Sequence, residues 1–343
     1  MKKTLYMIAL AACLSGCAAK QDPESTADKV QKYLDEWLAT NHPGKSIGED
    51  GICILEDKPG TGAEWDASKP YSKVILVVRS LSGGVSACYE EQLDKQLGNY
   101  SPANYYGYRV MNVSSGYAGQ EAMLKGMKEG GERTALIPLW MLTTNRYSSQ
   151  KEYKDNCPGG ASLVYTIRYG GQVEDIVAAT RQELKDYVSA NFGPDINPVS
   201  FNDASGAADI FYFIPDQASI QGKEELATDA SIGLDYTGTV VGGQLFDTTV
   251  EKVAKDAGIW NSARTYGKVK IKLSDSYATI SMSGNSNLVD GFKGALAQMK
   301  YPGEKGVAIF CHDLGYGSSG NGKTIPPYAI LRFDLSFAEA ADE

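Results

Sequence analysis

The stretch "DYTGTVVGGQLFDTT", residues 235–249, has the pattern of a β-hairpin. A segment rich in β-branched residues leads into the Gly242–Gly243 pair, and a second short apolar segment follows the pair. This pattern is typical of two antiparallel strands joined by a tight turn. Tyr236 lies in the first predicted strand, and Phe246 is followed directly by Asp247 in the second. The hairpin would therefore gather two aromatic rings and one carboxylate on a short piece of chain.

Two later segments extend the predicted sheet. "KGVAIFCHD" (305–313) and "YAILRFDLSF" (328–337) alternate apolar and polar residues. Such alternation is expected of half-buried antiparallel strands.

The order of elements recurs about 150 residues apart. "DKVQKYLDEWLATNHPG" (28–44) and "IVAATRQELKDYVSANFGPD" (176–195) place apolar residues at helical spacing and end at Gly and Pro. Each is followed by a short strand candidate and then by a strand that enters a Gly-Gly turn. We interpret this as a helix followed by a β-rich domain, twice; the alternative is a coincidence of two helices before two β-rich regions.

The boundaries of these units follow from the same pattern. We predict a leader over 1–16, a tether and helix over 17–48, a first domain over 49–174, a linker helix over 175–198 and a second domain over 199–343.

The N-terminus has the features of an export signal. Lys2 and Lys3 precede an apolar run over 5–13, which is too short to span a bilayer. The sequence Leu14–Cys17 resembles the lipobox of bacterial lipoproteins, in which the cysteine is lipidated and becomes the new N-terminus. We therefore predict lipidation at Cys17; the alternative is a simple secretory signal with an incidental cysteine.

The charge of the chain limits its partners. It has 33 basic and 42 acidic residues, a net charge of −9. An acidic surface argues against binding to nucleic acid and to anionic lipid headgroups. The acyl chains would hold the protein to the membrane. Ala18 stands where an Asp is associated with inner-membrane retention, so we expect the outer membrane of the cell envelope.

The cysteines do not form a recognisable framework. After Cys13 and Cys17, four remain, too few and too scattered to staple the chain. They are Cys53, Cys88, Cys157 and Cys311. A bridge among the first three and buried free thiols are both open. No pair has C-x-x-C spacing and there are two histidines, so we expect no metal site and no cofactor.

A Gly-rich loop near the C-terminus resembles a phosphate-binding motif. Gly317–Thr324 fits G-x-x-x-x-G-K-[ST]. That motif needs a strand before the loop and a helix after it, because the helix N-terminus supplies amides to the phosphate. Here Ile325-Pro326-Pro327 and a predicted strand follow. We therefore expect no nucleotide.

The second half of the chain, over 232–337, resembles the FK506-binding-protein (FKBP) family of peptidyl-prolyl isomerases. The shared motifs occur in the family's order: Tyr-Thr-Gly, Phe-Asp, a G-F-x-x-A-L helix ending in Met, Tyr-Gly, Ile-Pro-Pro and a final Phe-Asp strand. The resemblance implies an α+β fold in which a twisted antiparallel sheet wraps around one short helix. With the repeat, it implies two such domains, each preceded by an amphipathic helix.

The same resemblance implies the residues of an apolar site that receives a proline. The catalytic positions carried over are Tyr236, Phe246, Asp247, Tyr316 and Ile325, and the substrate-binding positions are Leu288, Val289, Phe292 and Phe333. Phe292 stands where many members have Trp. The segment from Val250 to Ala278 is longer than in minimal members, so one wall position stays unassigned.

The first domain keeps the pattern of the fold but not that of the site. "AMLKGMKEGGERTALIP" (122–138) resembles the helix and strand of the family. At the aligned site positions, however, stand Arg79, Tyr89–Glu90, Gln120 and Leu142. A charge and an amide in an apolar pocket would need partners or water. We therefore expect this domain to lack the activity.

Two functions remain possible on these grounds. The first is an envelope foldase that isomerises X-Pro bonds in proline-containing exported polypeptides. The second is a non-catalytic binding or scaffold lipoprotein that keeps only the fold.

Overall fold

The computed structural model describes residues 25–156, 159–200, 210–285 and 287–341. The predicted leader, the lipidation position Cys17 and Cys157 lie outside these ranges. Within them, no helix combines the length and the apolar character needed to cross a membrane.

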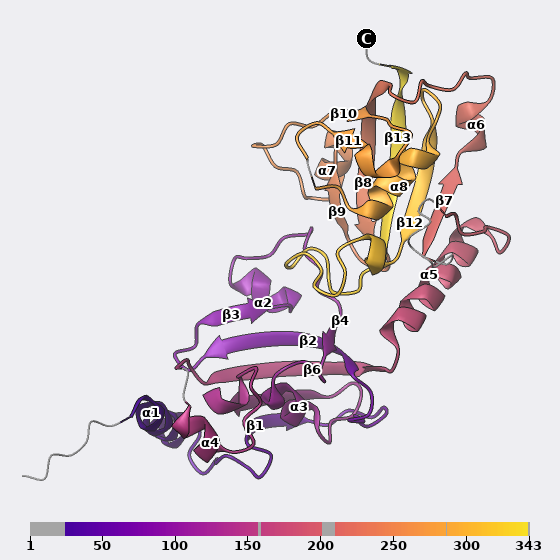
Figure 1. The fold of residues 1–343 in the computed structure, drawn as a ribbon. Coiled ribbons are helices and arrows are strands. Elements are labelled where there is room, and N and C mark those ends of the chain that lie inside the picture. Colours follow the sequence, from indigo (N-terminus) through magenta and orange to yellow (C-terminus); the bar gives the residue numbers. More distant parts are fainter. Residues whose placement is uncertain (1–24, 157–158, 201–209, 286, 342–343) are drawn as a thin grey trace, which may run out of the picture.

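The first unit is a six-stranded antiparallel sheet with short helices on its faces (Figure 1). The strand order is β1-β5-β6-β2-β3, and β4 also pairs with β2. Its elements are α1 (Thr26–Asn41), β1 (Cys53–Lys58), β2 (Tyr71–Ser80), β3 (Val85–Cys88), α2 (Glu91–Gln96), β4 (Arg109–Asn112), α3 (Ala118–Leu124), β5 (Glu132–Ile137), η1 (Leu139–Met141), α4 (Gln150–Asp155) and β6 (Leu163–Val173).

The second unit repeats this plan with seven strands. The order is β11-β10-β8-β13-β12-β7, with β9 also paired to β8. Its elements are α5 (Ile176–Phe192), β7 (Phe211–Pro215), α6 (Gln217–Ile220), β8 (Ser231–Val240), β9 (Leu245–Thr248), α7 (Glu251–Asp256), β10 (Val269–Lys272), η3 (Tyr277–Thr279), β11 (Ser281–Met282), α8 (Asp290–Gln298), β12 (Lys305–Phe310), η4 (His312–Leu314) and β13 (Leu331–Ala341).

The two sheets correspond strand by strand. The spatial order in the first sheet is β1, β5, β6 and β2, and it matches the order β7, β12, β13 and β8 in the second sheet. On β2 the hairpin partner is β3 and the further strand is β4; on β8 they are β9 and β10. The predicted α+β fold with two similar domains is therefore confirmed, and coincidence does not explain the repeat.

Helix α8 provides the apolar filling of the second sheet. Its buried residues include Phe292, Ala295 and Leu296. At Gly291 a Cβ atom would lie 2.5 Å from the ring of Phe310 on β12, so only glycine allows the helix to approach the strand this closely.

Helix α5 belongs to the second unit. The side chain of Asp175 accepts hydrogen bonds from the backbone N–H groups of Val177 and Ala178 and so caps the helix. Leu184 and Val188 are buried in the same core as β12 and β13. The helix that the sequence suggested as a linker thus packs two of its buried side chains into the core of the second unit.

The cysteines of the described segments are free. Cys53, Cys88 and Cys311 are buried and form no disulfide. Of the two options left open by the sequence, the structure has free thiols at these three positions.

Candidate functional site

The hairpin of β8 and β9 places a hydroxyl against a carboxylate. Gly238 is paired with Asp247 across the hairpin. The hydroxyl of Tyr236 donates a hydrogen bond of 2.7 Å to Oδ2 of Asp247. The ring of Tyr236 is buried, whereas the side chain of Asp247 remains 31% exposed. The hairpin therefore holds an acid at the edge of an apolar region, as the opening stretch suggested.

Four aromatic rings form the floor of this region. The ring centroids of Phe292 and Phe333 lie 4.9 Å apart, and those of Tyr236 and Phe292 lie 5.5 Å apart. Phe246 meets Phe333 edge-to-face at 5.7 Å. Gly238 makes room for this packing, because a Cβ atom there would lie 2.6 Å from the ring of Phe246.

Arg264 completes the polar edge of the site. It lies in the loop between α7 and β10 and forms an ion pair with Asp247. Burial disfavours the charge of Arg264, but the hydrogen bond and the charge of Asp247 outweigh it and leave the pKa of Arg264 raised. Burial, followed by the charge of Asp247, raises the pKa of Tyr236. The site thus combines a neutral phenol with a carboxylate that an arginine neutralises.

The sequence did not single out Arg264. It falls in the segment from Val250 to Ala278, which is longer than in minimal members of the family, and one basic residue in a polar loop carries no motif. The available signal was Asp247 itself, because a carboxylate beside aromatic rings needs a cation or several hydrogen-bond donors.

The rim of the site is built by two loops. Tyr316 and Leu288 are half-buried and pack on the core, and burial raises the pKa of Tyr316. The loop between η4 and β13, residues 315–330, carries Ile325 and is called the flap below. Ile325 is 1% exposed, and its N–H donates to the carbonyl of Asn321 at 3.1 Å.

The backbone N–H of Val289 is a second feature of the rim. This residue is the N-cap of α8, and its own carbonyl accepts hydrogen bonds from the helix. Among the described residues, we find no hydrogen-bond acceptor for the Val289 N–H. Of the nine residues carried over from the family, the eight aromatic and aliphatic ones lie in the core of the second unit or pack against that core. Asp247 joins them through its hydrogen bond with Tyr236.

The flap does not have the surroundings of a nucleotide site. It is followed by β13 and not by a helix. The ammonium group of Lys323, the lysine of the phosphate-binding pattern, contacts Asp94 at 2.7 Å. Among the described residues, no group of three or more His, Cys, Asp or Glu side chains could hold a metal ion.

In the first unit, the structure corrects the alignment of the site. The carbonyl of Leu76 accepts from the N–H of Tyr89, as that of Tyr236 accepts from Thr249. Leu76, not Arg79, therefore occupies the position of Tyr236, and Tyr89 corresponds to Thr249. The physical reason is the hairpin register: the β-bulge shifts the pairing after Val78 in β2 and after Gly238 in β8.

The hairpin partner strand follows the same register. Ala87 faces Val78 where Asp247 faces Gly238, and Ser86 precedes it where Phe246 stands. The first unit thus has neither the acid nor the aromatic ring at these positions. With the corrected alignment, the first unit still lacks the residues of the site. The site is missing because Ala87 and Ser86 are small, and not because the charge of Arg79 enters it.

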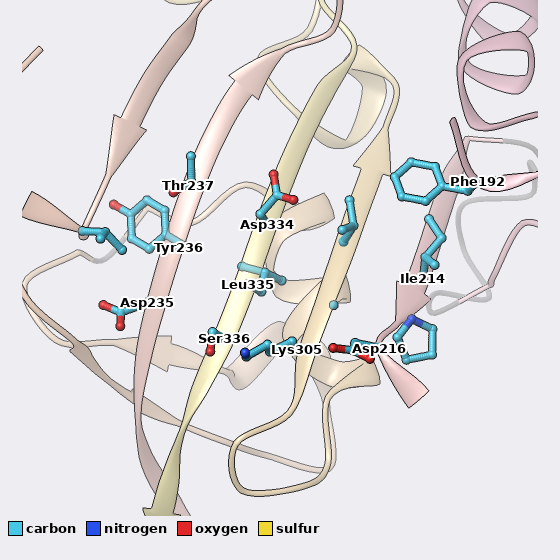
Figure 2. Close-up of a pocket in the computed structure, with 14 residues that line it drawn as sticks. Phe192, Ile214, Asp216, Asp235, Tyr236, Thr237, Lys305, Asp334, Leu335 and Ser336 are labelled. Carbon is cyan, nitrogen blue, oxygen red and sulfur yellow. The ribbon is translucent and has the colours of Figure 1, made fainter. Parts of the chain in front are cut away.

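A groove on the outer face of the second sheet shares one lining residue, Tyr236, with the aromatic site. It has a volume of about 500 Å³ and is lined in part by Phe192, Ile214 and Asp334. Figure 2 shows it across β8, β13 and β12. Because side chains alternate along a strand, Asp235 and Thr237 face this groove while the ring of Tyr236 packs on the opposite side.

Fold and site together define the class: an α+β domain in which an antiparallel sheet encloses one short helix and an aromatic site with a single carboxylate. These are the features that the resemblance to FKBP-type isomerases implies. No protein-family model matches the chain, and no curated protein matches it.

Solved structures that are similar to this chain include the following three. A peptidyl-prolyl cis-trans isomerase from Pseudomonas syringae has a TM-score of 0.31 and 15% identity, covering 50% of this chain and 100% of that one. The three FKBP domains of wheat FKBP73 give a TM-score of 0.28 and 14% identity, over 85% and 98% of the two chains. FkpA from Escherichia coli gives 0.29 and 19%, over 47% of this chain and 57% of that one. The class stated above therefore rests on the strand order and the site of this chain.

Proposed function

We propose that the second domain is a peptidyl-prolyl cis-trans isomerase of the FKBP type. The observation that carries the proposal is the Tyr236–Asp247–Arg264 arrangement beside the aromatic floor. The hydrogen bond of 2.7 Å and the ion pair hold a carboxylate at the mouth of an apolar region. A domain with only a structural role has no need for that combination.

The reaction requires no acid, base or nucleophile. Rotation about an amide bond costs about 18–20 kcal/mol because resonance must be broken. For an X-Pro bond, the cis and trans states differ by only about 0.5–1 kcal/mol. An apolar site favours the twisted state, in which the amide dipole is reduced, over the planar and better solvated ground state.

Two donors are available to hold the displaced carbonyl. The Tyr316 hydroxyl and the Val289 N–H lie at the rim, and a preorganised donor stabilises charge without reorganising during the reaction. Arg264 and Tyr236 fix the orientation of Asp247 in advance. The chain's own residues therefore supply shape, low polarity and a few oriented dipoles.

The test is turnover of a Leu-Pro or Phe-Pro tetrapeptide in a protease-coupled assay. We expect activity in the full chain and a loss of about tenfold in kcat/KM, or about 1.4 kcal/mol, for Asp247→Ala and Tyr236→Phe. Asp235→Ala is the matched control, since it removes a carboxylate from the outer face of the same hairpin, where Lys268 pairs with it. No turnover by a folded wild-type chain would refute the proposal.

One observation favours a non-catalytic binding role as the second candidate. The first unit keeps the sheet order without the aromatic site, so this chain contains the fold in a form that lacks the site. Binding of proline peptides without turnover would support this alternative.

We further propose that the protein is a lipoprotein of the cell envelope, that it is attached to the membrane through Cys17, and that it acts on proline-containing exported polypeptides. The attachment can be tested by membrane fractionation. A Cys17→Ala chain should lose fatty-acid label and leave the membrane fraction. Retention of both would show that the anchor is elsewhere.

A further inference from the structure

Asp94 on α2 is a carboxylate buried in the first unit whose cation comes from the second. The residue is 0% exposed, and its two oxygens lie 2.7 and 3.0 Å from Nζ of Lys323 in the flap. The hydroxyl of Tyr106 also donates to it at 3.0 Å. Burial favours the neutral acid, but the contacts with Lys323, Tyr106 and Cys88 outweigh it and lower the pKa of Asp94. Removing one partner of a buried ion pair is strongly unfavourable, so we expect loss of the Lys323 ammonium group to disturb this contact.

The flap backbone is held by the same part of the first unit. Arg109, 7% exposed, donates from Nη2 to the carbonyl of Gly322 at 2.7 Å. The N–H of Tyr105 donates to the carbonyl of Lys323 at 2.9 Å. Gln244 then joins the two sides, because its side-chain amide donates both to the carbonyl of Ala103 and to that of Thr324. Figure 1 shows the flap reaching from the second unit toward β4 and α2.

A second contact lies at the far end of the flap. Tyr71, the first residue of β2, packs edge-to-face on Tyr328 with ring centroids 5.6 Å apart. Tyr328 has a positive φ of 60°, a conformation that non-glycine residues seldom adopt. The ring of Tyr328 also meets that of His312 in a T-shaped contact, with ring centroids 5.0 Å apart. The first unit thus contacts the flap on both sides of Ile325.

The corresponding positions in the second unit lack these groups. Asp94 is the fourth residue of α2, and Ala254 is the fourth residue of α7. Arg109 opens β4, and Val269 opens β10. The ionic groups therefore belong to the contact between the units and are not a requirement of the fold.

We propose that the first domain is a positioning module for the second: Asp94 and Arg109 hold the flap segment 322–324 and thereby fix Ile325 in the wall of the aromatic site. Ile325 directly follows the held segment, so a loosened segment frees that wall. The contact of Asp94 and Arg109 with the flap should affect substrate binding. This effect on kinetics rests on the proposed function. Asp94 and Arg109 are positioning residues, since neither touches the site itself.

The primary measurement is hydrogen exchange in the full chain, which does not depend on activity. The N–H groups of Asn321, Ile325 and Tyr328 are bonded within the flap, so their exchange reports its opening. We expect exchange over 320–328 to become about tenfold faster in Lys323→Gln and in the Asp94→Asn/Lys323→Gln double variant. In the double variant no buried charge is left unpaired. Lys323→Arg should restore protection, and Lys252→Gln, an exposed lysine of α7, should leave the flap unchanged.

The kinetic measurement separates the two proposals. If the wild-type chain is an isomerase, the same variants should raise KM about tenfold, which is about 1.4 kcal/mol, and change kcat less than twofold. If the wild-type chain shows no turnover, the proposed function is refuted. The hydrogen-exchange result still tests whether the first domain holds the flap. Unchanged flap exchange in the double variant overturns the inference, whether or not the first domain remains folded, because loss of that domain must also release the flap.

Discussion

Gly238 on β8 offers a direct test of how the aromatic floor is built. A Cβ atom at this position would lie 2.6 Å from the ring of Phe246 and 2.9 Å from the ring of Phe333. Carbon atoms in contact are normally about 3.5–4.0 Å apart, so Gly238→Ala forces one ring to move. Phe333 is wedged between Phe292 and Phe310. The half-buried Phe246 should therefore move outward.

The size of the effect follows from two opposing contributions. Overpacking a core costs about 1–3 kcal/mol, and replacing Gly by Ala returns about 0.4–1 kcal/mol by restricting the unfolded chain. We expect a net loss of about 1–2 kcal/mol in the free energy of unfolding, or roughly 2–8 °C in Tm for a domain of this size. Displacing Phe246 should lower kcat/KM about two- to tenfold, which corresponds to the worth of one aromatic contact.

Thermal unfolding and peptide turnover of two further variants make the test selective. Gly48→Ala makes the same change where the nearest atom is 3.6 Å away, so it should not destabilise. Gly238→Ala/Phe246→Ala removes the ring that clashes, and its loss of stability should be clearly smaller than the sum of the two single losses. Strictly additive losses would show that the two residues do not interact, and the account of the floor would then be wrong.

Three other outcomes follow from the structure. Turnover should be nearly constant between about pH 6 and 8, because Tyr236 has a raised pKa and stays neutral there; a steep profile in the peptide assay would contradict this. Burial lowers the pKa of His312 from its ordinary 6.5. Below pH 6.5 the unfolded chain therefore binds a proton at His312 that the folded chain does not, and stability falls as the pH drops. Urea midpoints at pH 7 and 5.5 should differ less in His312→Gln than in the wild-type chain. A fragment over 175–343 should unfold at a higher urea concentration than one over 199–343, since only the first retains the buried side chains of α5; equal midpoints would place α5 outside the core.

Much of the second domain could be predicted because its signals are local. The alternation of strands, the Gly-Gly turn and the spacing of Tyr236, Phe246 and Asp247 all lie within one hairpin. Residues this close in sequence are paired by the hairpin itself, so their meeting needs no knowledge of the rest of the fold.

The misplaced details depend on register and on distant contacts. The sequence aligns Arg79 with Tyr236 because Arg79 follows the Val77-Val78 pair, yet a β-bulge after Val78 sets the true pairing. Arg264 reaches Asp247 from a loop without a motif, and Asp94 meets Lys323 across 229 positions of the chain. Hydrophobic periodicity predicts which face of an element is buried but does not identify the partner of a single charged group.

The loop that follows the short helix after each hairpin has a similar backbone in both halves of the chain, but its contacts differ between the halves. It runs from α2 to β4 in the first half and from α7 to β10 in the second, with Gly98 and Gly258 at φ of 73° and 71° after the helix. The second copy carries Arg264, which pairs with Asp247 of its own domain. The first copy leads into Arg109, the first residue of β4, which donates to the flap of the other domain. The halves are therefore not interchangeable modules. A chain assembled from two copies of the second half would carry two aromatic sites but would lack the groups that grip a flap.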